Sequence, residues 1–223
     1  MSDQPSAADE IMDGVYHALR AHGYADLTMQ DIADECSKSK SLLHYHYDTK
    51  EDLLVAFLEH IITDSAERIE AHADDPATER LVAFIGWFVF GADAADREAF
   101  HIALLELRTQ GPFNDRIREQ LDRSDQVLRG TVADILESGI DEGVFRDVDV
   151  DETAALLVAT LDGARTRQIT LSESIGAGVE PSYTRRVAEA SLERVIDPIL
   201  VEGVELPPLA DQINELNREN GAE

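Results

Sequence analysis

Apolar residues recur at three- and four-residue intervals along nearly the whole chain, which is the spacing of one face of a helix. Ile11, Val15, Ala18 and Leu19 form the first such stripe, and Gly23 ends it. Alternating runs of β-branched residues joined by Asn-Gly or Asp-Gly turns, the usual signals of strands and hairpins, do not occur. The pattern therefore predicts an all-α protein with about nine helices.

Local start and stop signals divide this pattern into elements. Thr28 is a suitable N-cap for a short helix that carries three apolar residues, and a second short helix is expected over about residues 39–47. Asp48 then caps a longer helix, which ends near residues 73–76. Further helices are predicted over residues 76–90, 96–110, 113–139, 151–174 and 182–201.

The charge of the chain is strongly negative and its lysines are few. Among 223 residues, 46 are Asp or Glu and 19 are Lys or Arg, which gives a formal net charge of −27. Acidic excess with few lysines suits a cell interior of molar salt, where the Debye length is roughly 3 Å and self-repulsion is screened. We interpret the composition as that of a halophile's protein, and expect an archaeal one; the alternative is an ordinary acidic mesophile protein.

All three lysines, Lys38, Lys40 and Lys50, lie in one short segment. Lys38 and Lys40 lie within the run Ser37–Ser41, and Lys50 follows the run His44–Tyr47. Both runs follow a short predicted helix after a tight polar turn. This layout is typical of a helix-turn-helix whose second helix enters the DNA major groove. Residues 1–58 nevertheless hold four basic and eleven acidic residues, so counterion release alone would not hold them on DNA.

Each polar residue of the segment has a predicted contact. Thr28 and Gln30 begin the first motif helix, where backbone N–H groups and a hydroxyl suit a phosphate. The helix that follows presents the residues predicted to reach base edges, with Lys40 as the candidate for guanine: Ser39, Lys40, Ser41 and His44. The remaining predicted contacts, mainly with phosphate, are Lys38, Tyr45, His46 and Lys50. Alternatively, His44 and His46 are exposed without a role; Leu42, Leu43 and Tyr47 are interpreted as packing residues.

The stretch from Thr28 to Leu54 resembles, without a gap, the N-terminal domain of TetR-family repressors. The matching features are the Thr N-cap, an Ile-Ala pair, the Ser that opens the second helix, an aromatic-rich run and a Lys-acidic-acidic-Leu-Leu sequence. The chain departs from the family at Ser37-Lys38, where Gly-Val is usual, at Leu42 and at His44. The resemblance implies a dimeric helix-turn-helix protein whose C-terminal helices bind a ligand and dimerise.

The later helices resemble, more loosely, the ligand domain of a TetR subgroup that includes choline-responsive repressors of betaine synthesis. Aromatic and polar residues on three neighbouring helices are the predicted ligand-binding set: Phe84, Trp87, Phe88, Phe100, His101, Leu104, Arg108 and Phe113. They could line an apolar pocket, or simply form the core. Arg108 could hold an anionic ligand, and an aromatic cage could equally hold a quaternary ammonium.

Small residues recur at three- and four-residue spacing in the last two long helices, which lets helices approach closely. The first of these helices carries Leu156, Leu157, Ala159, Thr160, Gly163 and Ala164, and the second carries Val187, Ala190, Ser191, Arg194 and Val195. We interpret these faces as a two-fold four-helix homodimer interface; the alternative is packing within one chain.

Several classes of protein lack support in the sequence. Cys36 is the only cysteine, so an intramolecular disulfide is impossible. The first ten residues have no apolar core of a signal peptide, and the longest apolar run, residues 81–92, is too short to span a bilayer. No metal-ligand spacing, phosphate-binding glycine loop or paired nucleophile and base is found. We therefore expect a cytoplasmic protein that is not an enzyme and has no cofactor, metal or membrane partner.

Together these features predict a helix-turn-helix DNA-binding domain over residues 1–50, a helical ligand-binding and dimerisation domain over residues 51–203, and a loosely attached tail over residues 204–223. The predicted function is that of a ligand-responsive transcriptional regulator, a repressor released from double-stranded operator DNA by an unidentified small-molecule effector. The alternative is a regulator without a small-molecule ligand that responds to a partner protein or to salt.

Overall fold

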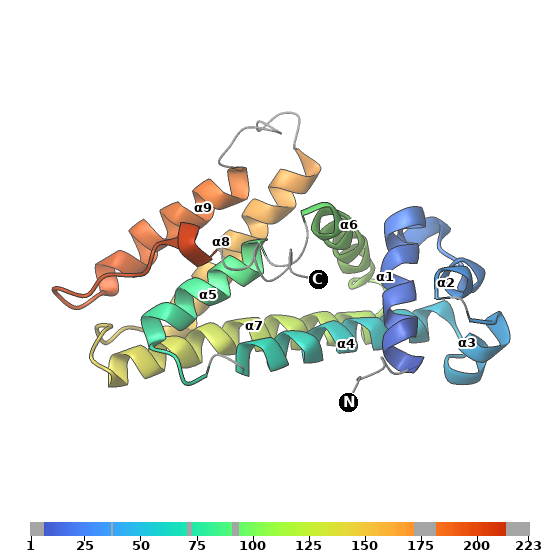
Figure 1. The fold of residues 1–223 in the computed structure, drawn as a ribbon, viewed down its shortest axis with the longest axis horizontal. Coiled ribbons are helices and arrows are strands. Elements are labelled where there is room, and N and C mark those ends of the chain that lie inside the picture. The colour runs from blue at the N-terminus through green and yellow to red at the C-terminus, as the bar shows by residue number, and fades with distance from the viewer. Residues whose placement is uncertain (1–6, 37, 71–72, 91–93, 172–181, 213–223) are drawn as a thin grey trace. The chain divides into compact units, whose positions relative to one another are not determined.

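The computed structural model describes residues 7–36, 38–70, 73–90, 94–171 and 182–212. Within these ranges every regular element is a helix, and one isolated antiparallel bridge pairs Phe145 with Leu200 (Figure 1). The α-helices are α1 (Ala7–Asp26), α2 (Met29–Glu35), α3 (Lys40–His46), α4 (Lys50–Glu70), α5 (Ala77–Phe90), α6 (Ala94–Gln110), α7 (Asp115–Asp141), α8 (Val150–Thr170) and α9 (Tyr183–Ser191). The predicted all-α fold is confirmed. None of the described helices is long and apolar enough to cross a membrane.

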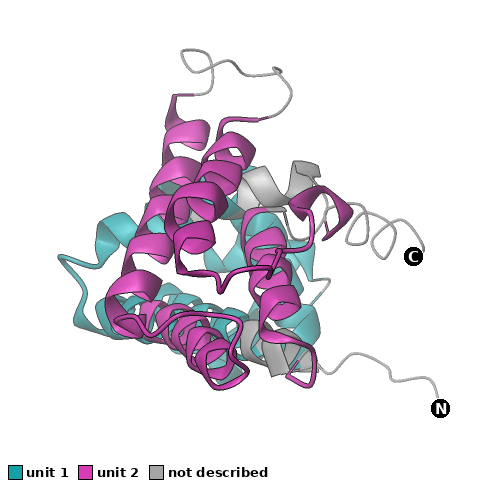
Figure 2. Cartoon of the chain, turned by 90° about the vertical axis from the view of Figure 1, so that its left-hand side faces the viewer, with its two compact units in different colours: residues 1–65, 98–124 teal, residues 66–97, 125–223 magenta. Residues whose placement is uncertain are grey.

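The chain forms two compact units, which Figure 2 shows in different colours. Unit 1 comprises residues 1–65 and 98–124, and unit 2 comprises residues 66–97 and 125–223. Unit 1 is larger than the predicted first domain of residues 1–50, because it includes much of α4 and the junction of α6 with α7. The boundary between the units falls inside α4, α6 and α7, so three continuous helices run from one unit into the other.

The core of unit 1 is built on the apolar stripe of α1. Ile11, Val15, Ala18 and Leu19 are all buried, as the helical spacing predicts. They pack with buried residues of α2, α3 and α4, and with two residues that come much later in the sequence, Leu107 and Ile117. A distant part of the chain therefore completes the core that α1 to α4 form.

Two glycines shape the ends and the packing of α1. Gly23 has φ +68°, in the left-handed region that favours glycine, and it interrupts the helix where the sequence predicts its end. Gly14 allows α1 and the end of α2 to approach closely, because an added Cβ would lie 2.5 Å from the Cβ of Cys36. The half-buried Cys36 is thus a packing residue in the core of unit 1.

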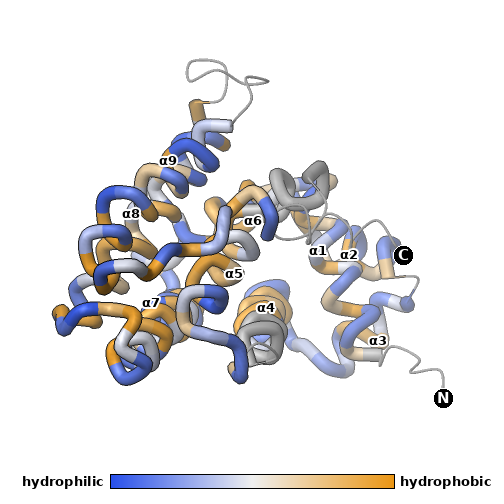
Figure 3. Tube along the Cα trace, turned by 60° about the vertical axis from the view of Figure 1, so that its left-hand side comes forward, coloured by the Kyte–Doolittle hydropathy of each residue, from blue (hydrophilic) through white to orange (hydrophobic). Residues whose placement is uncertain are grey.

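The core of unit 2 is formed by α5, α7, α8 and α9 with the turn that follows α7. In Figure 3 hydrophobic and hydrophilic positions alternate along α8 and α9, as expected for helices that bury one side. Gly139 of α7 lets the ring of Phe145 lie against the helix, since an added Cβ would fall 2.0 Å from Phe145 Cδ2. Phe145 is itself buried, so the close turn after α7 is part of the core.

The C-terminal part of unit 2 differs from prediction. The expected single helix over residues 182–201 is instead α9, a π-helical turn (Leu192–Ile196) and a 3-10 turn (Asp197–Ile199). Pro198 cannot donate a backbone hydrogen bond, which favours an end of the helix at this point. The predicted loose tail is also packed in its first part: Leu209 is buried, and Val204 and Leu206 contact the core. Residues 213–223 of that tail lie outside the described residues.

Candidate nucleic-acid interface

Helix α3 presents an exposed polar face because a single apolar residue fixes its other side. Leu43 is fully buried in the core of unit 1, while Lys40, Ser41 and His44 are exposed. Ser39 caps the helix by accepting a hydrogen bond at Oγ from the Leu42 N–H, 3.2 Å away. The predicted base-reading residues therefore lie at the N-cap and on the first two turns of a short, anchored helix.

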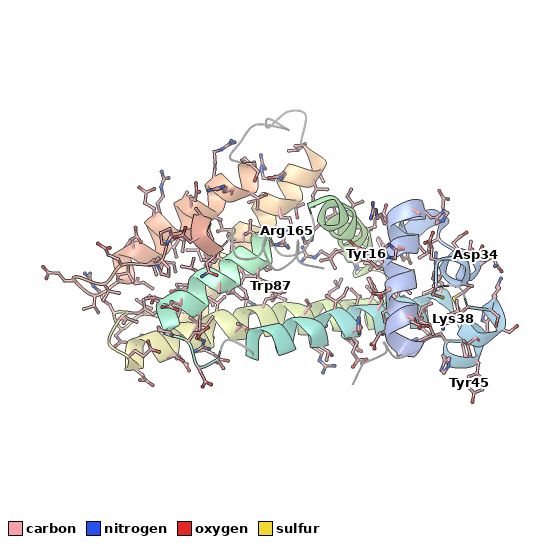
Figure 4. The ribbon with its side chains drawn as sticks, in the orientation of Figure 1. Tyr16, Asp34, Lys38, Tyr45, Trp87 and Arg165 are labelled. Carbon is pink, nitrogen blue, oxygen red and sulfur yellow. The ribbon has the colours of Figure 1, made fainter. Side chains whose placement is uncertain are left out.

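Tyr45 and His46 continue this exposed surface toward the end of α3. The Tyr45 side chain is 80% exposed, and Figure 4 shows it projecting away from the helices. Its ring meets the His46 ring edge-on, with centroids 5.1 Å apart. Tyr47, by contrast, packs against the core, and burial raises the pKa of its hydroxyl. The interpretation of Tyr47 as a packing residue agrees with this position.

The start of α2 carries an internal network of polar contacts. The Thr28 N–H and hydroxyl both donate to Asp31 Oδ2, at 2.8 and 2.7 Å, and Asp31 N–H donates to Thr28 Oγ1. These hydrogen bonds lower the pKa of the Asp31 carboxyl. Gln30 donates from Nε2 to Asp34 Oδ1 at 2.7 Å. Thr28 must therefore exchange its bonds to Asp31 before it can bind an anion, whereas the Gln30 amide keeps a second N–H for its predicted phosphate contact.

Lys38 lies at the turn of the motif, and its ammonium forms an ion pair with Glu10 of α1. Its side chain is mostly buried, and its backbone N–H donates to Ala33 O at 3.0 Å. Lys38 occupies the position where the family usually has an apolar core residue, and the pair with Glu10 explains how a lysine is accommodated there. The neighbouring Ser37 lies outside the described residues.

Lys50, the first residue of α4, is also engaged within unit 1. Its Nζ donates to two backbone carbonyl oxygens, those of Tyr24 and Leu27, both at 3.0 Å. The ammonium also lies 4.8 Å from the centroid of the Tyr24 ring, a cation–π arrangement. An ammonium has three N–H donors, so one remains for the predicted phosphate contact. Of the three lysines, Lys40 alone has no hydrogen bond or ion pair within the described part of the chain.

The first turn of α4 is tied to the start of α7. Thr49 and Asp52 form a capping box, in which the Thr49 N–H and hydroxyl donate to Asp52 Oδ2 at 2.9 and 2.7 Å. The other carboxylate oxygen pairs with Arg116 of α7. The bond from Thr49 and then the contact with Arg116 lower the pKa of Asp52. A second ion pair between α4 and α7 joins Arg123 Nη1 to Glu59 Oε1 at 3.2 Å.

A buried anchor, a capped short helix and an exposed polar face form the geometry of a helix-turn-helix reader. The profile described as "Bacterial regulatory proteins, tetR family" matches residues 11–57, which include this whole arrangement. The profile described as "BetI-type transcriptional repressor, C-terminal" matches residues 76–197. The chain belongs to the TetR family. The predicted DNA-binding transcriptional regulator is thereby confirmed, and ligand-responsive repression is the function typical of this family.

Individual transcriptional regulators are similar to this chain over most of its length. A TetR transcription regulator from Haloarcula marismortui is 35% identical, with 87% of this chain and 98% of that chain covered and a TM-score of 0.75. A transcriptional regulator from Saccharomonospora viridis, solved in complex with choline, is 25% identical, with coverage of 89% and 100% and a TM-score of 0.72. The transcriptional repressor AcnR of Corynebacterium glutamicum is 23% identical over 176 residues, which are 78% of this chain and 88% of that protein.

The aromatic residues predicted on α5 form a cluster inside unit 2. Phe84 and Phe88 are buried and stacked, with ring centroids 5.8 Å apart, and the Trp87 ring lies 6.0 Å from Phe84. The Arg165 guanidinium of α8 lies 4.1 Å from the centroid of the Phe88 ring, and Figure 4 labels it with Trp87. Arg165 was not among the predicted ligand residues, although an arginine on the same helix face as the buried Val158 and Leu161 was a visible signal.

The other predicted ligand residues belong to unit 1. Leu104 packs against the core of that unit, and His101 and Arg108 are half-buried. Phe113 was predicted to line an apolar pocket, but its side chain is 88% exposed because it lies in the turn between α6 and α7. The side chain of Phe100 lies outside the described residues. The structure thus groups Phe84, Trp87 and Phe88 within unit 2, and His101, Leu104, Arg108 and Phe113 are residues of unit 1.

Sequence reasoning missed three residues that position the interface. Glu10 directly precedes the α1 stripe and pairs with Lys38 at the motif turn. Gly14 interrupts an apolar helical stripe, which is a recognised signal of close backbone approach. Glu106 accepts a hydrogen bond from the Tyr24 N–H. Nothing in the local sequence around Glu106 indicates a partner 82 residues away.

Proposed function

We propose that the protein is a dimeric, DNA-binding repressor of a halophile, released from its operator by a small molecule in the cytoplasm. The observation that carries the proposal is the exposed face of α3, with Lys40, Ser41 and His44 held outward by the buried Leu43. A helix presented in this way enters the major groove with its first turn against the base edges. The acidic composition and the similarity to a Haloarcula marismortui regulator support a halophilic source.

The proposed contacts follow from position on α3. Lys40 and His44 are four residues apart and share one face of the helix, as do Ser41 and Tyr45. Lys40 and Ser41 at the N-terminal turn reach base edges, while Tyr45, His46 and the third N–H of Lys50 meet phosphates. Lys38 contributes to the motif through its pair with Glu10.

The direct test is binding of the purified protein to the DNA upstream of its own coding sequence, in molar KCl. Fluorescence anisotropy with a labelled duplex should show saturable binding that a scrambled duplex of equal length does not compete away. If the folded protein binds both duplexes equally weakly, the proposed operator-reading role is wrong.

Lys40→Ala should weaken specific binding by about 1–3 kcal/mol, the usual contribution of a base contact. Because Lys40 has no bond within the described part of the chain, its removal should leave folding unchanged. Binding to a scrambled duplex should change much less than binding to the operator, since base contacts and not phosphate contacts carry sequence information. Lys40→Arg, which keeps a guanine-binding donor, is the matched control. Equal losses on both duplexes would assign Lys40 to the phosphate backbone instead.

Dimerisation is proposed through α8 and α9, because a face of α8 remains apolar and exposed in the single chain. Leu156 is 54% exposed, and Ala159 and Gly163 lie on the same side of the helix at spacings of three and four residues. The neighbouring Leu157 and Ala164, also predicted at the interface, are instead buried within unit 2. A two-fold axis at this face would give the two recognition helices the symmetric half-sites that such readers need.

Gly163→Leu should convert the dimer to a monomer, because a bulky side chain would separate the paired faces. Apart from its own helix, no atom of the described residues lies within 4 Å of a Cβ at Gly163, so the fold of each subunit should be unaffected. Gly130→Leu on α7 is the matched control, since that glycine also faces open space. Light scattering in high salt measures the mass of each variant. A wild-type monomer, or a dimeric Gly163→Leu, would contradict the proposed interface.

The proposed effector is a small molecule that acts on unit 2. The choline complex of the similar Saccharomonospora viridis regulator, and the cluster of Phe84, Trp87 and Phe88, support this assignment. In the present chain a guanidinium already covers the face of Phe88, so a quaternary ammonium would need a different aromatic face or displacement of Arg165. Thermal unfolding with choline and with short carboxylates, followed by release of labelled operator, tests both chemistries. If a partner protein or salt alone releases the labelled operator from the protein, the alternative is favoured, namely a regulator without a small-molecule ligand.

A further inference from the structure

We propose that Glu106 of α6 is a positioning residue for DNA binding, which fixes the segment leading into the helix-turn-helix by holding the Tyr24 N–H. The proposal rests on the proposed function, because its main consequence is a change in operator affinity. It assigns a role to a residue that touches neither the DNA-reading face nor the aromatic cluster of unit 2. All of the contacts that carry it lie within unit 1.

The first contact joins α6 to the end of α1. The backbone N–H of Tyr24 donates to Glu106 Oε2, and a Cβ added at the preceding Gly23 would lie 3.2 Å from both carboxylate oxygens. Gly23 has φ +68°, so glycine provides both the backbone turn and the room for the carboxylate. A charged acceptor makes a stronger hydrogen bond with a backbone N–H than a neutral acceptor does.

The second contact joins the same short segment to α4. The Lys50 ammonium donates to the carbonyl oxygens of Tyr24 and Leu27, both at 3.0 Å, and lies over the Tyr24 ring. The Tyr24 residue is therefore held through its N–H by α6 and through its carbonyl and ring by α4. We call this set, Glu106, Tyr24 and Lys50, the Tyr24 clasp.

The Tyr24 clasp determines where α2 begins. Leu27 is buried, and Thr28 directly after it caps α2, the helix that supports the recognition helix α3. The clasp thus fixes both ends of the segment from Gly23 to Leu27, which enters the motif. Loss of the Glu106 contact would release the N-terminal end of that segment, while Lys50 would still hold its carbonyls.

Helix α6 presents Glu106 from an anchored position within unit 1. Leu107, next to Glu106, is fully buried in the core of that unit. The backbone of α6 is therefore fixed at this point, and Glu106 reaches Tyr24 from a helix that the core of unit 1 holds in place.

Three substitutions at one position separate the hydrogen bond from the charge. Glu106→Ala removes both, Glu106→Gln keeps an oxygen acceptor at the same distance, and Glu106→Asp keeps the charge but shortens the side chain. Arg123→Ala is the matched control, because it removes a different contact between helices of unit 1, the 3.2 Å pair with Glu59. Operator affinity is measured by anisotropy in 2 M KCl, with thermal unfolding and light scattering on the same samples.

Glu106→Ala should weaken operator binding about tenfold or more, as expected for loss of a hydrogen bond to a charged group. Glu106→Gln should stay within about threefold of the original affinity, since its amide oxygen can accept from Tyr24. Glu106→Asp should resemble Glu106→Ala, and Arg123→Ala should leave affinity unchanged. Hydrogen exchange should be faster at the Tyr24 amide in Glu106→Ala and Glu106→Asp only.

The proposal is overturned if Glu106→Ala binds the operator like the original protein, or if Glu106→Gln loses as much affinity as Glu106→Ala. If Glu106→Ala does not fold, the other two substitutions decide: retained binding in Glu106→Asp with loss in Glu106→Gln would show that charge, and not the Tyr24 contact, matters. If the unmodified protein binds no DNA, the proposed function fails, while hydrogen exchange at Tyr24 still decides whether the clasp exists.

Discussion

Leu107→Ala should lower the free energy of unfolding by about 2–5 kcal/mol, the usual cost of a large-to-small substitution in a core. Leu107 is fully buried and packs with residues of the DNA-binding segment, more than fifty positions earlier in the chain. The cavity would open inside unit 1, so operator binding should be lost with stability. Urea denaturation followed by circular dichroism in 2 M KCl measures the loss, and hydrogen exchange should locate it in α1 to α4.

Phe113→Ala is the matched control for this substitution. Phe113 lies only six positions further along the chain, but its side chain is 88% exposed, so its removal should change stability by less than about 0.5 kcal/mol. Ile117→Ala should behave like Leu107→Ala, because Ile117 is fully buried in the same core. A DNA-binding segment that keeps its stability in both core variants would show that residues 98–124 are not part of its folding unit.

The helices themselves could be predicted because their signals are local. Helical spacing, the Thr28 cap and the break at Gly23 each depend on residues within a few positions, and the structure has all three. The set of chain segments that make up unit 1 could not be predicted in the same way. An amphipathic stripe shows that one face is buried, but it does not show which distant helix covers that face, as Leu107 and Ile117 do for α1 to α4.

The candidate DNA-binding site was likewise predictable only where its features depend on local sequence. The exposed face of α3 could be predicted, because a short helix with one buried leucine leaves little choice of orientation. The partners of Lys38 and Lys50 could not, because a cluster of ammonium groups in the sequence says nothing about carboxylates or carbonyls that approach from elsewhere. Two of the three lysines hold unit 1 together, through Glu10 and through the Tyr24 and Leu27 carbonyls. The number of lysines therefore overestimates the positive charge that faces DNA.

This small number of available cations leads to the prediction with the largest effect, which concerns salt. Binding should survive KCl concentrations that remove an ordinary repressor from DNA. An ordinary protein–DNA affinity falls linearly on a log–log plot, with a slope of about −0.9 per neutralised phosphate, so six to ten contacts cost roughly 10³–10⁵ between 50 and 200 mM salt. In this protein Lys40 is the one lysine without a bond inside the described part of the chain.

Acidic side chains beside the motif should oppose the usual release of cations. Asp34 and Glu35 are exposed at the end of α2, close in sequence to Lys38 and Lys40, and the whole chain carries a charge of −27. As these carboxylates approach phosphate they should take up K⁺, and uptake cancels part of the release from DNA. The net slope should therefore be shallow or even positive. Folding should also need salt, because the unscreened chain repels itself.

Fluorescence anisotropy with an operator duplex from 0.5 to 3 M KCl measures the slope, and circular dichroism at each concentration shows whether the protein is folded. Asp34→Asn with Glu35→Gln provides the control, since loss of both carboxylates should make the slope more negative without removing a phosphate contact. A steep negative slope on folded, unmodified protein would mean that the lysines dominate the interface. In that case the acidic surface serves solubility and folding in salt, and DNA binding follows the ordinary rule of counterion release.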